Sequence, residues 1–259
     1  MREILLTILL GIVQGLTEFL PVSSSGHLTL LSEIFGINQN NLFTSVALHF
    51  GTLMSVVVYY YKDLIGLFRK ENHKTIWFII LATIPAGIVM LLIHNTVETM
   101  FSSSKYVSFG FLLTAIILLI TEYIGRRIKP KPNITYKSAL IIGLSQAMAI
   151  FPGISRSGST ISGGIILAGT DRKKVADFVF LMSIPIIFGS TVFEAVSVDF
   201  SSINIVATIL GIIASFVTGL IAIKFMMRII KKCNFKWFSL YLFTLFLVTF
   251  INGFIHPIW

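Results

Sequence analysis

The chain has a single cysteine and few charged residues. Cys233 stands alone among 259 residues, which excludes a disulfide framework and a metal site built from cysteines. Asp, Glu, Lys and Arg make up 12% of the residues, roughly half the charged fraction of an ordinary soluble domain. So small a charged fraction cannot cover a water-facing surface. It excludes a soluble enzyme, a disordered chain and a nucleic-acid binder that reads its target through a basic face.

The residues that are present indicate a helical membrane protein. Hydrophobic residues make up 55% of the chain, 23 residues are Phe, and the mean hydropathy is +0.90. A helix needs roughly 20 apolar residues to cross the hydrocarbon core of a bilayer, and six segments meet or approach that length without a charged residue. We predict transmembrane helices at residues 42–61, 75–93, 106–121, 178–193, 202–223 and 237–255.

Two further apolar segments are shorter and are interrupted. Residues 4–20 run into a cluster of Pro, Ser and Gly at 21–27, and residues 138–151 run into a similar cluster at 152–160. Apolar sequence resumes after both clusters. An interruption at membrane depth is tolerated only where it is buried in protein or lines a wet cavity. We therefore predict two re-entrant helical hairpins.

The two interrupted segments match each other at an offset of 132 residues. Twice this offset nearly equals the chain length, so we predict one integral membrane domain over 1–259 that consists of two repeats, about 1–132 and 133–259. The predicted fold is all-α, and each repeat holds one re-entrant hairpin and three transmembrane helices. Three crossings place the second repeat in inverted topology, a duplication whose paired broken segments point to the site. The identical pairs are Gly11 with Gly143, Gln14 with Gln146, Phe19 with Phe151, Ser23 with Ser155, Ser25 with Ser157 and Gly26 with Gly158.

The positive charges agree with that topology. Seventeen of the 20 Lys and Arg residues lie in four loops, and positive loops remain on the cytoplasmic side of a membrane. The N-terminus is then outside, together with Arg2 and Lys105, while Arg156 falls inside the second hairpin. The net charge of +9 therefore reflects the orientation of the protein in the membrane. Arg156 is the positive residue that this topology does not explain, so it is a candidate functional residue. The four loops are 62–74, 125–137, 171–177 and 224–236.

The first hairpin carries ionisable and hydroxyl groups. Gln14 and Glu18 lie one turn apart on the same helix face, and ionisable residues at membrane depth indicate a functional site. The cluster that follows adds a nucleophile and a proton carrier to the carboxylate. Two structural alternatives remain open: Gln14 bonds across a helix interface with Glu18 at a wet mouth, and the serines cap a helix. The cluster consists of Ser23, Ser24, Ser25, Gly26 and His27.

The second hairpin supplies a cation. A phosphate group suits the planar fork of Arg156 and the hydroxyls around it. The alternative is an internal ion pair with Glu18, and both can hold if the pair forms when the site is empty. The repeat aligns Glu18 with Ile150, so the two repeats differ at a position where the first has an ionisable group. This asymmetry favours an enzyme over a symmetric pore. The candidate phosphate-binding residues are Ser155, Ser157 and Thr160 in this hairpin and Ser23, Ser25 and Gly26 in the first, and Gln146 repeats the supporting role of Gln14.

These motifs resemble the signature segments of the bacterial undecaprenyl-diphosphatases, also called bacitracin resistance proteins. The resemblance rests on Gln14-x-x-x-Glu18, on residues 20–27 and on residues 152–160, and it extends along the chain in length, spacing and pattern of apolar segments. The first motif position is Glu or Gln in that family, so Gln14 is not a disabling departure.

The resemblance implies a membrane hydrolase that acts on a phosphoric anhydride. The enzyme would convert undecaprenyl diphosphate to undecaprenyl phosphate and inorganic phosphate, recycle the lipid carrier of peptidoglycan synthesis and confer bacitracin resistance. It implies a divalent cation, Mg²⁺ or Ca²⁺, and a site that opens to the outer side of the bacterial cytoplasmic membrane. No nucleic-acid partner is expected, and the oligomeric state is open, a homodimer included. Carried over by motif position, the functional residues are Glu18, Ser24, His27, Ser155, Arg156 and Thr160.

A mechanism follows as a hypothesis. Arg156 and its hydroxyl neighbours grip the terminal phosphate and stabilise charge on its oxygens. Ser24 attacks phosphorus and His27 exchanges the proton, while Glu18 orients His27 or holds the metal. In a variant, His27 activates water directly and Ser24 only binds phosphate.

Two other functions compete with this one. A membrane anion or lipid-phosphate transporter or flippase would use the same intramembrane site, because paired broken segments are a transporter feature. The combination of Glu18, Ser24 and His27, which transport does not require, favours the enzyme. The type 2 phosphatidic-acid phosphatases share short Ser-Gly-His and Ser-Arg fragments, but Ser162 stands where that class has its second His.

Overall fold

The structure is all-helical within the described residues. The computed structural model describes residues 1–37, 42–101, 104–195, 204–232 and 234–255, and these contain no β-strand. The predicted all-α class is thus confirmed; Cys233 and the start of the predicted span 202–223 lie outside the described residues. The helices are α1 (Arg2–Phe19), α2 (Ser24–Phe35), α3 (Leu42–Tyr59), α4 (Tyr61–Leu67), α5 (His73–Phe101), α6 (Ser104–Ile124), α7 (Tyr136–Met148), α8 (Arg156–Ser162), α9 (Arg172–Ala195), α10 (Ile205–Lys232) and α11 (Lys236–Phe250).

Five helices in the described ranges are long and apolar enough to cross a membrane, which confirms a multi-pass membrane protein. The sixth predicted segment, 42–61, differs: its apolar helix, Thr44–Tyr59, is shorter than the other five. The chain leaves helical geometry at Tyr60 (φ −101°, ψ 19°) before α4 begins, and this bend shortens the span. The five long apolar segments are Lys70–Ile93, Lys105–Ile124, Arg172–Val192, Ile205–Ile230 and Lys236–Phe254.

Both predicted interruptions are places where one helix ends and another begins. Residues 20–23 separate α1 from α2, and residues 149–155 separate α7 from α8. The Ser23 hydroxyl caps α2 by accepting a hydrogen bond from the N–H three residues later (3.3 Å), and Ser155 caps α8 in the same way (3.1 Å). Hydroxyl caps of this kind satisfy N–H groups that a helix start leaves unpaired. The Ser-rich clusters therefore end one helix and start the next.

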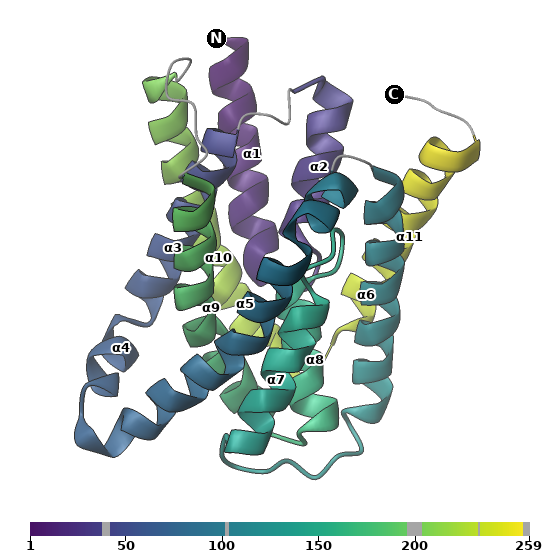
Figure 1. Cartoon of the computed structure of the whole chain (residues 1–259). Coiled ribbons are helices and arrows are strands. Elements are labelled where there is room, and N and C mark those ends of the chain that lie inside the picture. The colour runs from purple at the N-terminus through teal and green to yellow at the C-terminus, as the bar shows by residue number, and fades with distance from the viewer. Residues whose placement is uncertain (38–41, 102–103, 196–203, 233, 256–259) are drawn as a thin grey trace.

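The helix pairs bring the two interruptions together near the middle of the bundle. In Figure 1, α1 descends from the end of the molecule that carries the N-terminus and α2 returns toward it, whereas α7 and α8 lie toward the opposite end. α1 packs along α10, α7 packs along α5, and α6 packs along α11. The α1–α10 contact needs a glycine, because a Cβ at Gly15 would overlap the α10 backbone at Ser215 and Gly219. The end of α1 lies beside the start of α8, where the Ser157 hydroxyl donates to the carbonyl of Leu20.

Apolar side chains form both the core and the outer surface. Phe19, Phe111 and Phe180 are at most 1% exposed and pack around the interruptions. Leu91 and Leu92 on α5 are 76% and 77% exposed. A soluble protein rarely exposes so much apolar surface, so these outer faces suit contact with lipid.

Gly110 on α6 is the point against which the second interruption packs. A Cβ at Gly110 would collide with the carbonyl oxygen of Pro152 and lie 2.6 Å from the Cα of Gly153, whose own φ is +81°. Backbone atoms cannot move aside cheaply, so we expect Gly110→Ala to lower the free energy of unfolding by about 1–3 kcal/mol. A lower thermal midpoint of the purified protein in detergent would show this. Gly87→Ala is the matched control, since a Cβ there meets no described atom within 4 Å; equal shifts in both variants would contradict the prediction.

Candidate active site

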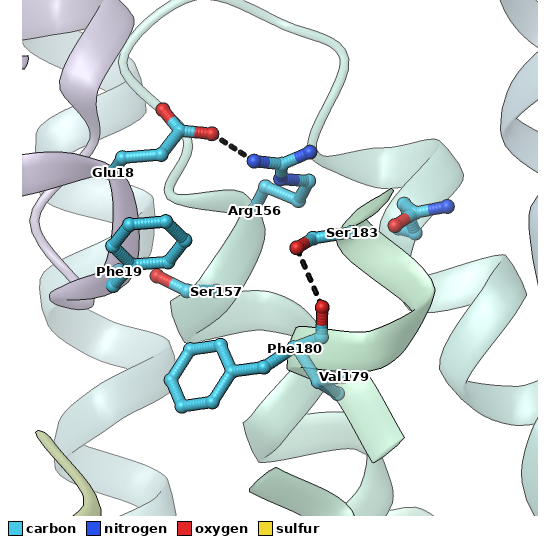
Figure 2. A pocket seen from close by; sticks show the side chains of 8 residues that line it. Glu18, Phe19, Arg156, Ser157, Val179, Phe180 and Ser183 are labelled. Carbon is cyan, nitrogen blue, oxygen red and sulfur yellow. Dashed lines mark hydrogen bonds and ion pairs between the residues drawn. The ribbon is translucent and has the colours of Figure 1, made fainter. Parts of the chain in front are cut away.

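Glu18, near the C-terminal end of α1, is the centre of the candidate site. Its Oε2 accepts hydrogen bonds from Gln14 Nε2 (3.0 Å) and from the Ser24 hydroxyl (2.6 Å). Its Oε1 forms an ion pair with Arg156, the first residue of α8, as Figure 2 shows. The ion-pair alternative raised from the sequence is therefore confirmed. One carboxylate connects both helices of the first hairpin with the cation of the second.

The ion pair is asymmetric in its exposure. The Glu18 side chain is 4% exposed and the Arg156 side chain is 22% exposed. Taking such a pair out of water is costly unless further hydrogen bonds compensate, and Gln14 and Ser24 supply two of them. A guanidinium carries five N–H donors. The pair with Glu18 uses Nη2, so the other donors of the fork are the ones that an incoming anion can engage.

A small pocket adjoins the ion pair (Figure 2). Its polar lining comes from Glu18, Arg156, Gln146, Ser157 and Ser183, and Phe19, Val179 and Phe180 complete it. Gln146 donates to the carbonyl of Ala82 over 3.5 Å, while its Oε1 has no partner among the described residues. The Oε1 of Gln14, on the other side of Glu18, is also unpartnered there. Buried polar atoms without partners are uncommon, so these amide oxygens mark places where a water or a ligand donor fits.

Two hydroxyls of the predicted phosphate-binding set cap the starts of α2 and α8. Ser23 and Ser155 are the N-caps described above, which confirms the capping alternative for Ser23, and the Ser25 hydroxyl lies 3.4 Å from that of Ser23. Ser23 adopts a φ of +67°, unusual for a residue with a side chain. Gly26 gives α2 room to approach α6, because a Cβ there would lie 2.6 Å from the ring of Phe111.

Two more predicted residues join the hairpins or stiffen α8. The Ser157 hydroxyl donates to the carbonyl of Leu20 over 2.9 Å, a direct bond from the second interruption to the first. Thr160 is fully buried, and its hydroxyl donates to the carbonyl of Arg156 over 2.7 Å. Thr160 thus supports the turn that carries the guanidinium.

His27 is directed away from Glu18. Its Nδ1 lies 2.7 Å from the carbonyl oxygen of Ser23, and its Nε2 lies 2.6 Å from the Tyr241 hydroxyl on α11. The hypothesis that Glu18 orients His27 is therefore wrong for this structure. The ring sits one helical turn beyond Ser23, and the bond from Nδ1 back to that carbonyl turns Nε2 toward α11.

The structure adds three residues to the neighbourhood that the sequence motifs missed. His49 on α3 bonds to the carbonyl of Ser45 (2.9 Å) and also brings Nε2 to 4.0 Å from Glu18 Oε2. Thr114 on α6 accepts a hydrogen bond from the Ser155 N–H (3.0 Å). Tyr241 holds His27. The lone His in an apolar helix was a usable signal, whereas Thr114 and Tyr241 reach the site only through packing.

The site offers oxygen donors for a divalent cation. No group of three or more His, Cys, Asp or Glu residues in the described part of the chain is arranged to hold a metal ion. Glu18 supplies a carboxylate, and Gln14 Oε1 beside it is an unpartnered oxygen. Mg²⁺ is commonly bound by one or two carboxylates together with substrate phosphates. These two oxygen donors therefore fit a divalent cation whose remaining ligands would be phosphate oxygens of the substrate.

Comparisons with known proteins agree on one family. The family model for the bacitracin resistance protein BacA matches residues 7–248. The undecaprenyl-diphosphatase of Halothermothrix orenii is 41% identical over 244 residues, which cover 92% of this chain and 94% of the relative. The undecaprenyl-diphosphatases of Thermosipho africanus (40% identical; 95% and 99% covered) and Christiangramia forsetii (42% identical; 94% and 96% covered) are similarly close.

Proposed function

The chain belongs to the bacitracin resistance protein BacA family, and on that basis we propose that it is an undecaprenyl-diphosphatase. The enzyme hydrolyses undecaprenyl diphosphate to undecaprenyl phosphate and inorganic phosphate. It thereby recycles the lipid carrier of peptidoglycan synthesis and confers bacitracin resistance. The observation that carries the proposal is the Glu18 carboxylate, which holds Arg156 through one oxygen and the Ser24 hydroxyl through the other. A transporter needs the cation but not a hydroxyl held on a carboxylate, and the named relatives are phosphatases.

Arg156 binds the terminal phosphate of the substrate. A diphosphate carries more negative charge than a single carboxylate, so it competes with Glu18 for the guanidinium. The planar fork pairs with two phosphate oxygens and stabilises the charge that develops on them in the transition state. Ser157 and the caps Ser23 and Ser155 keep the two helix starts together around the phosphate. The polyprenyl tail remains in the lipid.

Ser24 is the nucleophile and Glu18 is the group that receives its proton. The Ser24 O–H already donates to Glu18 Oε2 over 2.6 Å, the contact that a general base makes with a nucleophile. Attack of Ser24 Oγ on the terminal phosphorus breaks the bond to the bridging oxygen, and undecaprenyl phosphate leaves. Water then hydrolyses the phosphoserine to inorganic phosphate, with His27 exchanging a proton at this stage. Direct attack by water is the competing route, tested in the Discussion.

A divalent cation, Mg²⁺ or Ca²⁺, completes the proposed site. Glu18 and the Oε1 of Gln14 would hold it together with phosphate oxygens. When bound, the cation neutralises charge on the diphosphate.

The site lies between two inverted repeats in the bacterial cytoplasmic membrane and opens to the outer side. The chain is one integral membrane domain, with repeats at about 1–132 and 133–259. Reciprocal packing supports this: α1 of the first repeat packs along α10 of the second, and α7 of the second packs along α5 of the first. The caps Ser23 and Ser155 stand at the same offset of 132 residues and make the same bond. Seventeen of 20 positive residues in four loops support the orientation, with both hairpins re-entrant.

Phosphate release by the purified protein tests the proposed function. We expect release of inorganic phosphate from undecaprenyl diphosphate in detergent, loss of that release after treatment with EDTA, and recovery when Mg²⁺ or Ca²⁺ is added back. Proteoliposomes loaded with phosphate serve as the comparison. Phosphate flux without hydrolysis would instead support a transporter and would overturn the enzyme proposal.

A further inference from the structure

The His27 side chain is held by a helix from the far end of the chain. Its Nε2 lies 2.6 Å from the hydroxyl of Tyr241 on α11, 214 residues away in sequence. The two rings stack with centroids 5.7 Å apart and planes 17° apart. Phe111 on α6 meets the imidazole edge-on, with centroids 5.7 Å apart. The imidazole is therefore fixed by a hydrogen bond at each nitrogen and by aromatic contacts from two helices.

The partners of the two nitrogens assign the proton. A backbone carbonyl can only accept a hydrogen bond, so the 2.7 Å contact with Ser23 places the proton of neutral His27 on Nδ1. Nε2 is then the acceptor, and the Tyr241 hydroxyl donates to it. Any proton that His27 gains must arrive at Nε2, at the position that the Tyr241 hydroxyl occupies.

We propose that Tyr241 is a positioning residue of the hydrolase, an inference that rests on the proposed function in which His27 exchanges a proton. The hydroxyl and ring of Tyr241 hold the imidazole with Nε2 unprotonated and in a fixed place. Holding a catalytic group ready in this way raises turnover and leaves substrate affinity nearly unchanged. Tyr241 positions His27, which exchanges a proton, and not Arg156, which binds the phosphate. We therefore expect its contribution to appear in kcat and not in KM.

Tyr241→Phe separates the hydroxyl from the ring. The phenyl ring keeps the stack on His27 and loses only the hydrogen bond to Nε2. The free energy of one hydrogen bond corresponds to about a fivefold to tenfold change. We expect kcat to fall by that factor and KM to stay within about twofold of the wild type. Tyr123→Phe on α6 is the matched control. Tyr123 is 66% exposed, and we expect the wild-type kcat for this variant. A Tyr241→Phe protein with wild-type kcat, or with a loss that lies in KM alone, would overturn the proposal.

Chemical modification reads the contact without any catalysis. Diethyl pyrocarbonate acylates an unprotonated imidazole nitrogen, and peptide mass spectrometry reports the modification of His27 by itself. We expect His27 to be acylated at least about threefold faster in Tyr241→Phe than in the wild type, because the Nε2 lone pair is no longer engaged. His73, the first residue of α5, is the internal reference and keeps its rate. An unchanged rate at His27 would show that the hydroxyl does not hold this nitrogen.

A double-mutant cycle separates failure of this inference from failure of the proposed function. In a His27→Gln background, Tyr241→Phe is expected to have no further effect on kcat, since the group that it positions is gone. Full additivity would assign Tyr241 a merely structural role and overturn the inference alone. If His27→Gln retained wild-type kcat, the proton role of His27 in the proposed function would fall first.

Discussion

Arg156→Ala is expected to lower kcat/KM for undecaprenyl diphosphate by about a thousandfold, the range in which donors to a transferring phosphoryl group contribute. In the structure Arg156 pairs with Glu18 and retains donors that can turn to an anion. Without the guanidinium, no cationic side chain of the second hairpin stabilises the charge that develops on the phosphate oxygens. Phosphate release by purified variants, measured with saturating and with low substrate, checks the prediction.

The control must account for the carboxylate that Arg156→Ala leaves behind. Removing one partner of a buried ion pair leaves an uncompensated charge and destabilises a protein, so a loss of activity could reflect unfolding. Arg156→Lys keeps the charge but not the planar fork, and we expect it to fold with a thermal midpoint near the wild type and still lose about tenfold to a hundredfold in kcat/KM. Undiminished release by both variants would remove Arg156 from the site.

Ser24→Ala is expected to lower kcat by at least about a thousandfold, because loss of a nucleophile removes the whole covalent route. Ser24 differs from its neighbours in one respect: its hydroxyl donates to Glu18, whereas Ser23 caps α2 and the Ser25 hydroxyl faces that of Ser23. Rapid quench with substrate labelled in the terminal phosphate should trap label on the wild-type protein and none on Ser24→Ala.

Ser25→Ala is the matched control for the nucleophile. It removes a neighbouring hydroxyl of the predicted phosphate-binding set without touching the carboxylate, and we expect kcat to fall by no more than about tenfold, the worth of one hydrogen bond. Near-wild-type turnover by Ser24→Ala would eliminate the phosphoserine and favour direct attack by water. Label trapped on Ser24→Ala would place the covalent intermediate on another residue.

The ion pair explains why the site depends on two distant segments. Glu18 is buried only because Gln14, Ser24 and Arg156 satisfy its oxygens, and Arg156 reaches it only because the two interruptions are bonded together through Ser157 and Leu20. Neither hairpin alone satisfies the charges it carries. One carboxylate therefore holds both the Arg156 guanidinium and the Ser24 hydroxyl. In the proposed function the diphosphate competes with this carboxylate for the guanidinium.

Features that depend on neighbouring residues were predictable from the sequence. Low charge and long apolar segments determine an all-helical membrane protein, because a segment in lipid must satisfy its own backbone hydrogen bonds. The Pro and Ser clusters determine where α2 and α8 begin, because an N-cap hydroxyl bonds to the N–H group three residues later. The candidate site residues were also predictable, because charged and hydroxyl side chains stand out within an apolar segment. The span 42–61 was predicted as one helix, whereas α3 ends at Tyr59, because hydropathy does not register the bend at Tyr60.

Contacts between distant residues were decided by the tertiary structure. The sequence offered Arg156 either a phosphate or Glu18, 138 residues away, and only packing of the two interruptions placed the pair in contact. It suggested that Glu18 orients His27, yet the imidazole turns to Tyr241 because α11 lies within reach of α2. Local hydrogen bonds and hydropathy act over a few residues and so can be read along the chain. The direction of a buried side chain depends on which helix packs against it, and that is a property of the folded bundle.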